Sequence, residues 1–475
     1  MDFTSSLHWS ELNYIIMDNF KDLVPKSEAE DGANFGFPFF QLLTDVMSGN
    51  RCLWSGSVAE NSFVNPILRK VGWEADVMFM SADFVISRDM QLHLFQDIPD
   101  EPGYVKVEAT ENIENDEVLV FKEITHSDGH SHLYIVPDLQ GFSPFDADSL
   151  LKTSRKNILV QSIFDTFELD NLSWKLQPHG PAFAHSLNGF SSVFELVARP
   201  KRTVSKFLGH LGTRVLEHFD AKPHVEKEVH QESSIKKGGQ MFDYMKPQTD
   251  AVIPDIGLMM DICPAIKCEG WPHKALRFFH RTRVWPDHTI LNKLLQSSFH
   301  FHLVYKPLNP LSQDSVEWRI SFSQAEISLF QSMDAFRIYC YRIFKAIYYS
   351  ELTLPKVLSP YHMKTIFLWA CERIPSEMWV ESNLAQIIMG LLDDLLHCLV
   401  TKSCPHYFIP ENNLFAHVHQ DFLDHLAKVV AKIRRNPERY PLVKTCSVDQ
   451  SAAQSASGDQ DKPQNESLDD GIELD

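Results

Sequence analysis

The chain has 475 residues, 44% of them hydrophobic, which is enough for one large domain or two closely packed ones and excludes a largely disordered protein. Its formal net charge of −19 excludes non-specific nucleic-acid binding by the protein as a whole, so only a local basic patch could attract such a ligand. Eight cysteines without C-x-x-C spacing indicate reduced thiols in the cytoplasm or the nucleus, and we expect neither a signal peptide nor a membrane span.

The first fifty residues are predicted to be helical. The spacing of apolar side chains favours a helix over residues 8–24 and another over 39–47, which ends at Ser48-Gly49-Asn50, a sequence typical of a turn. We expect the helices of residues 1–50 to pack on the core lobe that follows.

Short strands dominate the next part of the chain. Strand-like patterns occur over residues 75–80, 117–122, 133–136, 256–262 and 318–323. An amphipathic helix is predicted over 203–219, and a polar loop from Lys222 to Tyr244. This part, residues 51–323, is expected to form a mixed α/β lobe.

From Gln324 onward the pattern becomes helical. Helices are predicted over residues 324–350, 360–372, 382–402 and 419–435. No linker separates the two parts, so we expect an α+β protein with two lobes that share a cleft, the second lobe being residues 324–446. Residues 447–475 carry eight acids against one lysine, a net charge of −7, and are predicted to be disordered.

Two carboxylates in one predicted strand are the main indication of chemistry. Glu74 and Asp76 are two residues apart, so their side chains point to the same face and suit a divalent cation with oxygen ligands. Asp261, the single acid of another apolar strand, is the candidate third ligand, and the Gly56-Ser57 turn can hold a phosphate. The pattern predicts a metal-dependent nucleotidyl-transfer site. Alternatively, the acids are exposed on an edge strand and Ser57 caps a helix.

Basic residues gather in two short regions of this acidic chain. Together they are a candidate nucleic-acid patch, although they could also be ordinary helix surface. The candidates are Lys201, Lys206, Arg214, Lys274, Arg277 and Arg281. His397, Cys398, Cys404 and His406 match no zinc-finger spacing, and a buried thiol is the ordinary interpretation of Cys398.

A series of motifs in a fixed order carries a family resemblance. They are Gly56-Ser57, Glu74-x-Asp76, Asp261-Ile-Cys-Pro-Ala-Ile, Glu317-Trp-Arg-Ile-Ser-Phe-Ser-Gln-Ala-Glu326, Ser359-Pro-Tyr-His-Met-Lys-Thr365 and Cys404-Pro-His-Tyr-Phe-Ile-Pro-Glu411. Over most of its length the chain resembles the male-abnormal-twenty-one (Mab) family, which includes cyclic GMP–AMP synthase and the animal cGAS-like receptors. The resemblance implies a nucleotidyltransferase core lobe and a helical C-terminal lobe with the active site between them.

The resemblance also assigns roles to individual residues. It implies that Glu74, Asp76 and Asp261 hold Mg²⁺ or Mn²⁺. Phosphate contacts are implied for Gly56, Ser57, Lys345 and Ser359, stacking on a nucleobase for Tyr361, and contacts to base edges for Arg319, Ser321 and Ser323, with Glu326 a nearby polar contact. Trp318 is predicted to be a core residue.

The function implied is synthesis of a cyclic dinucleotide from ATP and/or GTP, in innate immune signalling, by an enzyme that a bound ligand activates. The vertebrate DNA sensor of the family carries a His/Cys zinc insertion after the Trp-Arg-x-Ser-Phe-Ser segment, whereas residues 328–339 contain no such cluster. We therefore expect double-stranded RNA or another activating ligand rather than DNA. The alternative is a catalytically silent family member that keeps the fold for partner binding.

Overall fold

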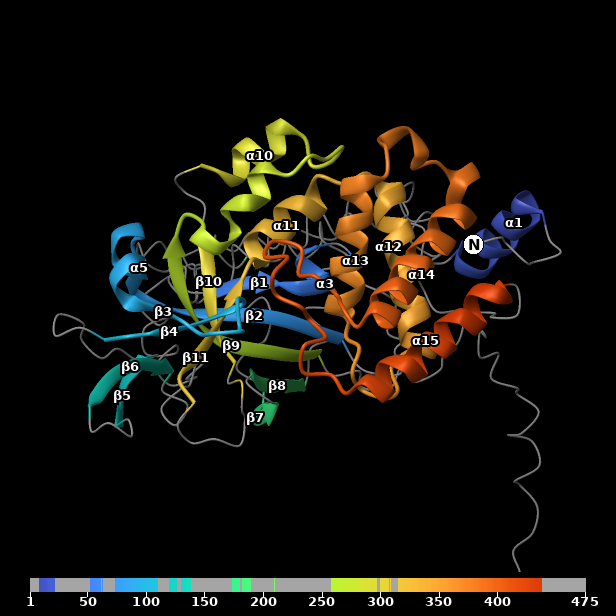
Figure 1. Cartoon of the computed structure of the whole chain (residues 1–475). Helices are drawn as coiled ribbons and strands as arrows, with labels where there is room; N and C mark the ends of the chain where they lie inside the picture. The colour runs from blue at the N-terminus through green and yellow to red at the C-terminus, as the bar shows by residue number, and fades with distance from the viewer. Residues whose placement is uncertain are drawn as a thin grey trace, which may run out of the picture.

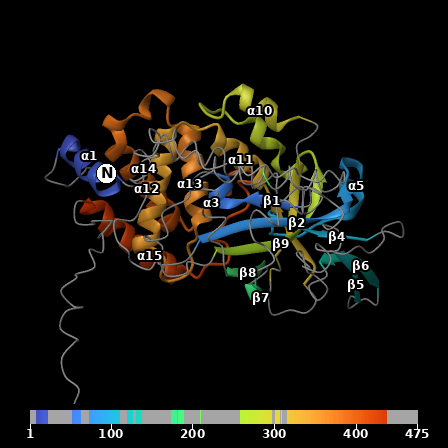
Figure 2. The same cartoon turned by 180° about the vertical axis from the view of Figure 1, so that it is seen from behind.

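The computed structural model places a β-sheet lobe beside a helical lobe (Figure 1). It describes residues 8–21, 52–60, 62, 73–109, 119–125, 130–137, 173–179, 182–188, 209, 258–296, 300–306, 308 and 315–437. The same two lobes lie side by side when the molecule is seen from behind (Figure 2). The segments 39–47, 203–219 (apart from Gly209), 222–244 and 447–475, on which predictions were made, lie outside the described residues.

A nine-stranded sheet forms the centre of the core lobe. Its main path runs β1–β2–β9–β10–β11–β4–β3, and β2 and β9 form a parallel pair while the other pairs are antiparallel. The hairpin β7–β8 joins the sheet through β8, which pairs with the first half of β9, and β5–β6 form a separate hairpin. The strands are β1 (Cys52–Ser55), β2 (Trp73–Ile86), β3 (Phe95–Asp97), β4 (Tyr104–Val107), β5 (Leu119–Thr125), β6 (Ser131–Pro137), β7 (Ser173–His179), β8 (Ala182–Asn188), β9 (Leu258–Glu269), β10 (His300–Tyr305) and β11 (Glu317–Ser321).

Apolar residues on the inner strands explain why this sheet is stable. In β10 five of the six residues are buried, as expected of a strand covered on both faces. Trp318 of β11 is completely buried, and its indole N–H donates to the Ile135 carbonyl at 2.8 Å. Trp318 is therefore a core residue, as predicted. The helices of this lobe are α3 (Gly56–Ala59), α5 (Arg88–Leu94), the 3-10 helix η4 (His273–His280), α10 (His288–Leu294) and α11 (Ser323–Gln331).

The predicted single helix over 324–350 is in fact two helices, α11 and α12 (Ala335–Glu351). The Asp334 side chain accepts the backbone N–H of Arg337 at 2.8 Å and so caps a new helix. Because α11 contacts β1, β10 and α3, it belongs to the core lobe. The boundary between the lobes therefore lies near Asp334 and not at 323/324. Ser323, predicted at the end of a strand, begins α11 instead.

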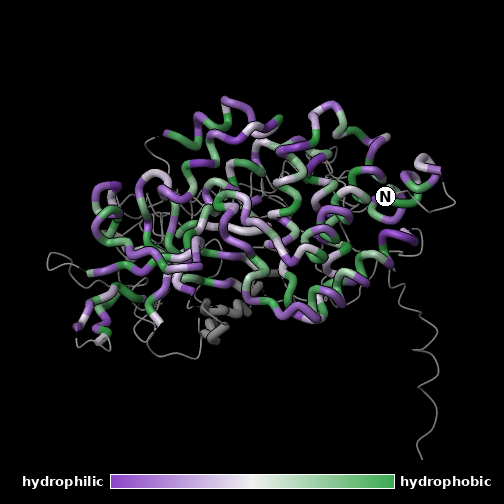
Figure 3. The backbone as a smooth tube through the Cα atoms, in the orientation of Figure 1, coloured by the Kyte–Doolittle hydropathy of each residue, from purple (hydrophilic) through white to green (hydrophobic). Residues whose placement is uncertain are grey.

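Four long helices build the other lobe. They are α12, α13 (Pro360–Arg373), α14 (Leu384–Thr401) and α15 (Gln420–Arg435), with the short 3-10 helices η5 (Ser376–Met378) and η6 (Glu381–Asn383) between α13 and α14. Figure 3 shows hydrophobic and hydrophilic residues alternating along α15. The buried apolar face of this helix packs against α14. By length and composition alone, the span Glu381–Thr401 could cross a membrane, but more than half of it is buried within the protein, as in the core helix of a globular lobe.

The prediction that the N-terminal helices pack on the core lobe is wrong for α1 (Trp9–Phe20). This helix packs on α14 of the helical lobe. Leu12, Ile16 and Phe20 recur every four residues and are buried against it. The Asn13 side chain adds two hydrogen bonds, one to the Glu381 carbonyl at 2.7 Å and one from the Ala385 backbone N–H at 2.8 Å. These two hydrogen bonds of the Asn13 side-chain amide fix α1 at the start of α14.

Candidate active site

Asp76 and Asp261 lie directly opposite each other on the parallel strands β2 and β9. Partners in register point to the same face of a sheet, so the two side chains project side by side. Asp76 is exposed and Asp261 is half-buried. Glu74 precedes Asp76 by two residues on the same strand, and its side chain lies outside the described part. The fold thus brings Asp261 to the Glu74–Asp76 pair, while the role of all three as metal ligands remains a prediction.

The Gly56-Ser57 turn lies against the Asp76 carboxyl group. Gly56 connects β1 to α3 with φ of +67°, a conformation that favours glycine. A Cβ atom at this position would clash with the Asp76 carboxylate and lie only 2.8 Å from Asp76 Cγ. The neighbouring Ser55 hydroxyl is 3.4 Å from the Asp76 carbonyl oxygen. The absence of a side chain on Gly56 therefore lets the turn approach the acid pair.

The end of β11 reaches the same region of the sheet. The hydroxyl groups of Ser321 and Ser323 are 2.9 Å apart, and the Ser321 hydroxyl contacts the Met78 sulfur at 3.9 Å. Met78 lies two residues after Asp76 on β2, so both side chains point to one face. The predicted base-reading residues Ser321 and Ser323 are thus close to the acid pair.

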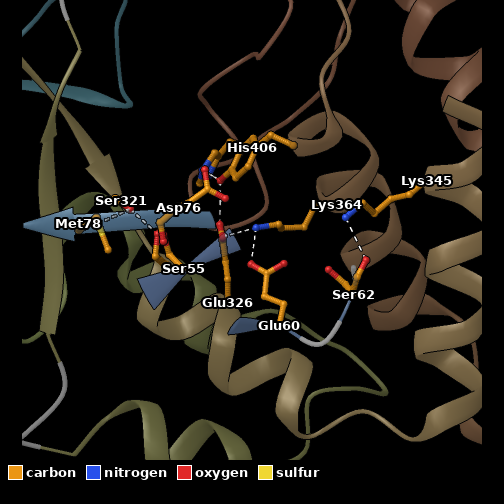
Figure 4. Close-up of polar contacts among 12 residues, drawn as sticks. Ser55, Glu60, Ser62, Asp76, Met78, Ser321, Glu326, Lys345, Lys364 and His406 are labelled. Carbon is orange, nitrogen blue, oxygen red and sulfur yellow. Dashed lines mark hydrogen bonds and ion pairs between the residues drawn. The ribbon is translucent and has the colours of Figure 1, made fainter. Parts of the chain in front are cut away.

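A buried ionic network lies where the lobes meet (Figure 4). The Lys364 ammonium of α13 donates to Glu60 Oε1 at 2.5 Å and to Glu326 Oε2 of α11 at 2.7 Å. All three side chains are buried. Burial raises the pKa of Glu60 to about 7, with Glu326 adding to this and Lys364 opposing it. Burial would also raise the pKa of Glu326, but the charge and hydrogen bond of Lys364, together with His406 and the Tyr361 hydrogen bond, hold that pKa below its ordinary value.

Tyr361 and His406 extend this network. The Tyr361 hydroxyl donates to Glu326 Oε1 at 3.0 Å and lies 2.8 Å from His406 Nε2. His406 Nδ1 accepts the backbone N–H groups of Phe408 and Ile409, while burial lowers the pKa of His406 to about 4. A neutral ring with an accepting Nδ1 carries its proton on Nε2, so His406 donates to Tyr361 and Tyr361 donates to Glu326.

Two family models match the chain, and their boundary falls where the structure separates the lobes. The Mab-21 protein nucleotidyltransferase domain matches residues 84–332, more than half of the chain. The Mab-21 protein HhH/H2TH-like domain matches residues 336–432. The chain belongs to the Mab-21 family. The Mab-21 nucleotidyltransferase domain corresponds to most of the mixed α/β lobe, and the Mab-21 C-terminal domain corresponds to helices α12 to α15.

The matched part of the Mab-21 nucleotidyltransferase domain contains Asp261, Arg319, Ser321, Ser323 and Glu326. The Gly56-Ser57 turn and Asp76 precede it, and β2, which carries Asp76, pairs in register with β9 of the family domain. The end of β2 lies within the match, so the strand belongs to the sheet of the family fold.

The structure gives Lys345 and Ser359 internal partners. The Lys345 ammonium is buried, donates to the Ser62 carbonyl at 3.1 Å and lies 5.5 Å from the centre of the Tyr341 ring. Ser359 caps α13, with its hydroxyl 2.9 Å from His362 Nδ1. The polar atoms of both groups are engaged within the protein in this conformation, and their contact with phosphate stays a prediction.

Three of the candidate basic residues lie in the described part of the chain, and each pairs with an acid, while the nucleic-acid patch stays a prediction. Lys274 pairs with Asp97 at 2.8 Å, and the exposed Arg277 pairs with Glu411 at 3.0 Å. Arg281 is largely buried, bonded to Glu372 at 2.9 Å and to the Tyr407 carbonyl at 2.7 Å, and it stacks over Trp369. Each positive charge is matched by an acid. Lys201, Lys206 and Arg214 lie outside the described residues.

Sequence reasoning missed several residues of this region. Lys306 directly follows β10, and the charge of Arg319 together with burial lowers the pKa of its ammonium to about 8. Burial, with the charges of Asp76 and Asp261, raises the pKa of the Cys263 thiol to about 12. Lys306, Arg319 and Cys263 therefore lie within electrostatic reach of one another. The signal that could have found Cys263 was its spacing of two residues from Asp261 on the same strand.

No group of three or more metal-ligating side chains is arranged around a common point among the side chains that the structure describes, a set that lacks Glu74. The described part of the predicted triad is the pair Asp76 and Asp261. Two carboxylates in register beside a glycine turn fit the oxygen-donor chemistry of a hard divalent cation.

Proposed function

We propose that this Mab-21 protein is a ligand-activated nucleotidyltransferase that joins ATP and/or GTP into a cyclic dinucleotide second messenger of innate immunity, acting in the cytoplasm. The observation that carries the proposal is the register of Asp76 with Asp261 beside the Gly56-Ser57 turn. Carboxylates on adjacent strands next to a phosphate-sized turn are the parts that nucleotidyl transfer needs.

Glu74, Asp76 and Asp261 would hold Mg²⁺ or Mn²⁺. Such an ion, when bound, neutralises the charge of the triphosphate and favours ionisation of the attacking ribose hydroxyl. The rest of the task is positioning, which is the main contribution of the protein in phosphoryl transfer.

The chain itself would orient the two nucleotides. The Ser57 hydroxyl and the backbone of the Gly56 turn would hold the leaving pyrophosphate near Asp76. Arg319 and Ser321 of β11, with Ser323 at the start of α11, would receive a base edge, since a guanidinium and two hydroxyls supply donors and acceptors. The half-buried ring of Tyr361 would lie against the second base.

Substitution of Asp261 by Asn tests the proposal. In an incubation with the four labelled nucleoside triphosphates, Mg²⁺ or Mn²⁺, and double-stranded RNA, the wild-type chain should form a phosphatase-resistant product. Asp261→Asn should lose more than the roughly 10- to 100-fold typical of an outer-shell change at a metal site. Asp97→Asn, on strand β3 at the opposite edge of the sheet, is the matched control and should retain activity. Equal activity of Asp261→Asn and wild type would refute the proposal.

A second candidate function is a silent Mab-21 protein that binds partners. It is favoured by the internal hydrogen bonds of Lys345, Ser359 and Tyr361, which occupy groups that a nucleotide would need. Thermal shift with ATP and Mn²⁺ separates the two functions. An enzyme should be stabilised by the pair and lose that response in Asp261→Asn, whereas a silent protein should respond in neither form.

A further inference from the structure

The segment from Gly56 to Ser62 is held by two lysines of the opposite lobe. Lys364 of α13 donates to the Glu60 carboxylate, and Lys345 of α12 donates to the Ser62 carbonyl (Figure 4). The two contacts join residues that are about 300 positions apart in the chain, at separations of 304 and 283. Both lysines are buried, and so are Glu60 and Ser62.

This segment needs such support because it cannot hold its own shape. The helix α3 has four residues, far below the roughly 12–15 that an isolated helix requires. Its turns are closed by two backbone hydrogen bonds, from Glu60 N–H to the Gly56 carbonyl at 3.1 Å and from Ser62 N–H to the Ser57 carbonyl at 3.0 Å. Tertiary contacts must therefore determine its conformation.

The two ends of the segment are fixed by different lobes. At its start, the close approach of Gly56 to the Asp76 carboxyl group ties it to β2 of the core lobe. At its end, the ammonium groups of Lys364 and Lys345 tie it to the helical lobe. The Lys364 charge is shared with Glu326, which receives the Tyr361 hydroxyl as well. The turn is thus connected to α11, α12 and α13 at once.

We infer that Lys345 and Lys364 are positioning residues that hold the Gly56-Ser57 turn in place from the helical lobe. They act through Ser62 and Glu60. The consequence for triphosphate binding rests on the proposed function of that turn. A displacement of α12 or α13 relative to the sheet is transmitted to the turn through these two buried contacts.

Hydrogen–deuterium exchange of the full-length chain without nucleotide tests this role. In Lys345→Met, the amides of Glu60 and Ser62 should exchange about tenfold faster, the scale of one lost charge-assisted hydrogen bond. Lys364→Met should have the same effect. Lys364→Met also leaves the buried carboxylates of Glu60 and Glu326 without the cation that they share. If Lys364→Met does not fold, Glu60→Gln is the milder variant that breaks the same contact. Arg434→Met breaks an ion pair to Asp393 inside the helical lobe and is the matched control, with no change at these amides.

ATP affinity, measured by calorimetry on the same variants, separates positioning from direct contact. Weaker ATP binding together with faster exchange supports positioning. Weaker ATP binding with unchanged exchange in Lys345→Met would overturn it, because Lys345 would then be a phosphate contact. Unchanged exchange in both lysine variants would overturn it as well. Faster exchange in a chain that transfers no nucleotide would leave the positioning role standing and remove the proposed function instead.

Discussion

Gly56 combines a positive φ of 67° with direct contact to the Asp76 carboxyl group. Alanine at this position faces two penalties. The left-handed backbone costs about 1–2 kcal/mol for a residue with a Cβ atom, and the new methyl group must displace the carboxylate. We expect Gly56→Ala to lower the free energy of unfolding by at least about 1 kcal/mol and to weaken ATP binding, measured by urea denaturation and calorimetry.

Gly390 provides the matched control for that substitution. It lies within α14, and a Cβ atom there would meet nothing within 4 Å. Alanine in a helix interior is favoured over glycine by roughly 0.5–1 kcal/mol, so Gly390→Ala should stabilise the protein and leave ATP binding unchanged. Similar effects of the two substitutions would contradict the geometry assigned to the Gly56 turn.

Glu60 should make stability depend on pH. Its pKa is raised from 4.5 to about 7, chiefly by burial, so between these values the folded chain holds a proton that the unfolded chain has lost. The stability that this proton contributes is fully present below about pH 4.5 and is lost as pH rises toward 7, at a cost on the order of 3 kcal/mol. Glu60→Gln does not titrate, so its stability relative to wild type should increase over this window.

Urea denaturation of both proteins at several pH values between 4.5 and 7.5 measures this difference. Burial lowers the pKa values of His362 and His406 to about 4, and these groups act in the opposite direction, with stability lost as pH falls from about 6.5 to 4. They are common to both proteins and cancel in the comparison. Parallel pH profiles for the two proteins would show that the pKa of Glu60 is not raised.

Among the elements, α1 is held in place by one buried face. Phe20, at its C-terminal end, is almost completely buried, while Tyr14 on the opposite side is 73% exposed. Phe20→Ala should destabilise the protein by about 3–5 kcal/mol, the usual cost of deleting a buried aromatic ring. Tyr14→Ala should change the free energy of unfolding by less than about 0.5 kcal/mol.

Denaturant unfolding of the two alanine variants gives these values directly. The helix α1 packs on α14, and the Asn13 side chain accepts a hydrogen bond from Ala385 at the start of α14. Hydrogen exchange in Phe20→Ala should therefore increase first around Ala385. A small loss of stability in Phe20→Ala would mean that α1 is not part of the cooperative helical lobe.

At the scale of the whole molecule, the net charge of −19 makes the pairing of its basic residues important. Arg281→Gln removes a largely buried partner of Glu372 and should cost about 3–5 kcal/mol. Arg277→Gln breaks an exposed pair with Glu411 and should cost no more than about 1 kcal/mol. Thermal and urea denaturation of the two variants check this.

The difference in stability between Arg281→Gln and Arg277→Gln determines which variant can test nucleic-acid binding. A loss of RNA binding in an Arg281 variant would report unfolding, whereas the folded Arg277→Gln variant isolates the effect of charge. If Arg277 contacts a phosphate, its loss should reduce the salt slope of log affinity by about 0.9, measured by fluorescence anisotropy at several salt concentrations. Equal stability of Arg277→Gln and Arg281→Gln would refute the burial assigned to Arg281.

The sequence by itself determined the features that depend on local pattern. The spacing of Glu74 and Asp76, the single acid Asp261 in an apolar strand, and the periodicity of α13 to α15 were all readable, because strand and helix periods are properties of neighbouring residues. The order of the motifs was also sufficient to recognise the Mab-21 family, and the two family domains contain the motifs from Asp261 onward.

The tertiary structure alone decided which charges are paired and which faces meet. Lys345 and Lys364 look like ordinary helix residues in the sequence, and their partners Ser62 and Glu60 lie about 300 positions away. The pairing of Arg281 with Glu372 and the packing of α1 on α14 are equally remote in the chain. Periodicity shows that a helix has a buried face but not what covers it, because burial is settled by contacts between segments that only the folded chain brings together.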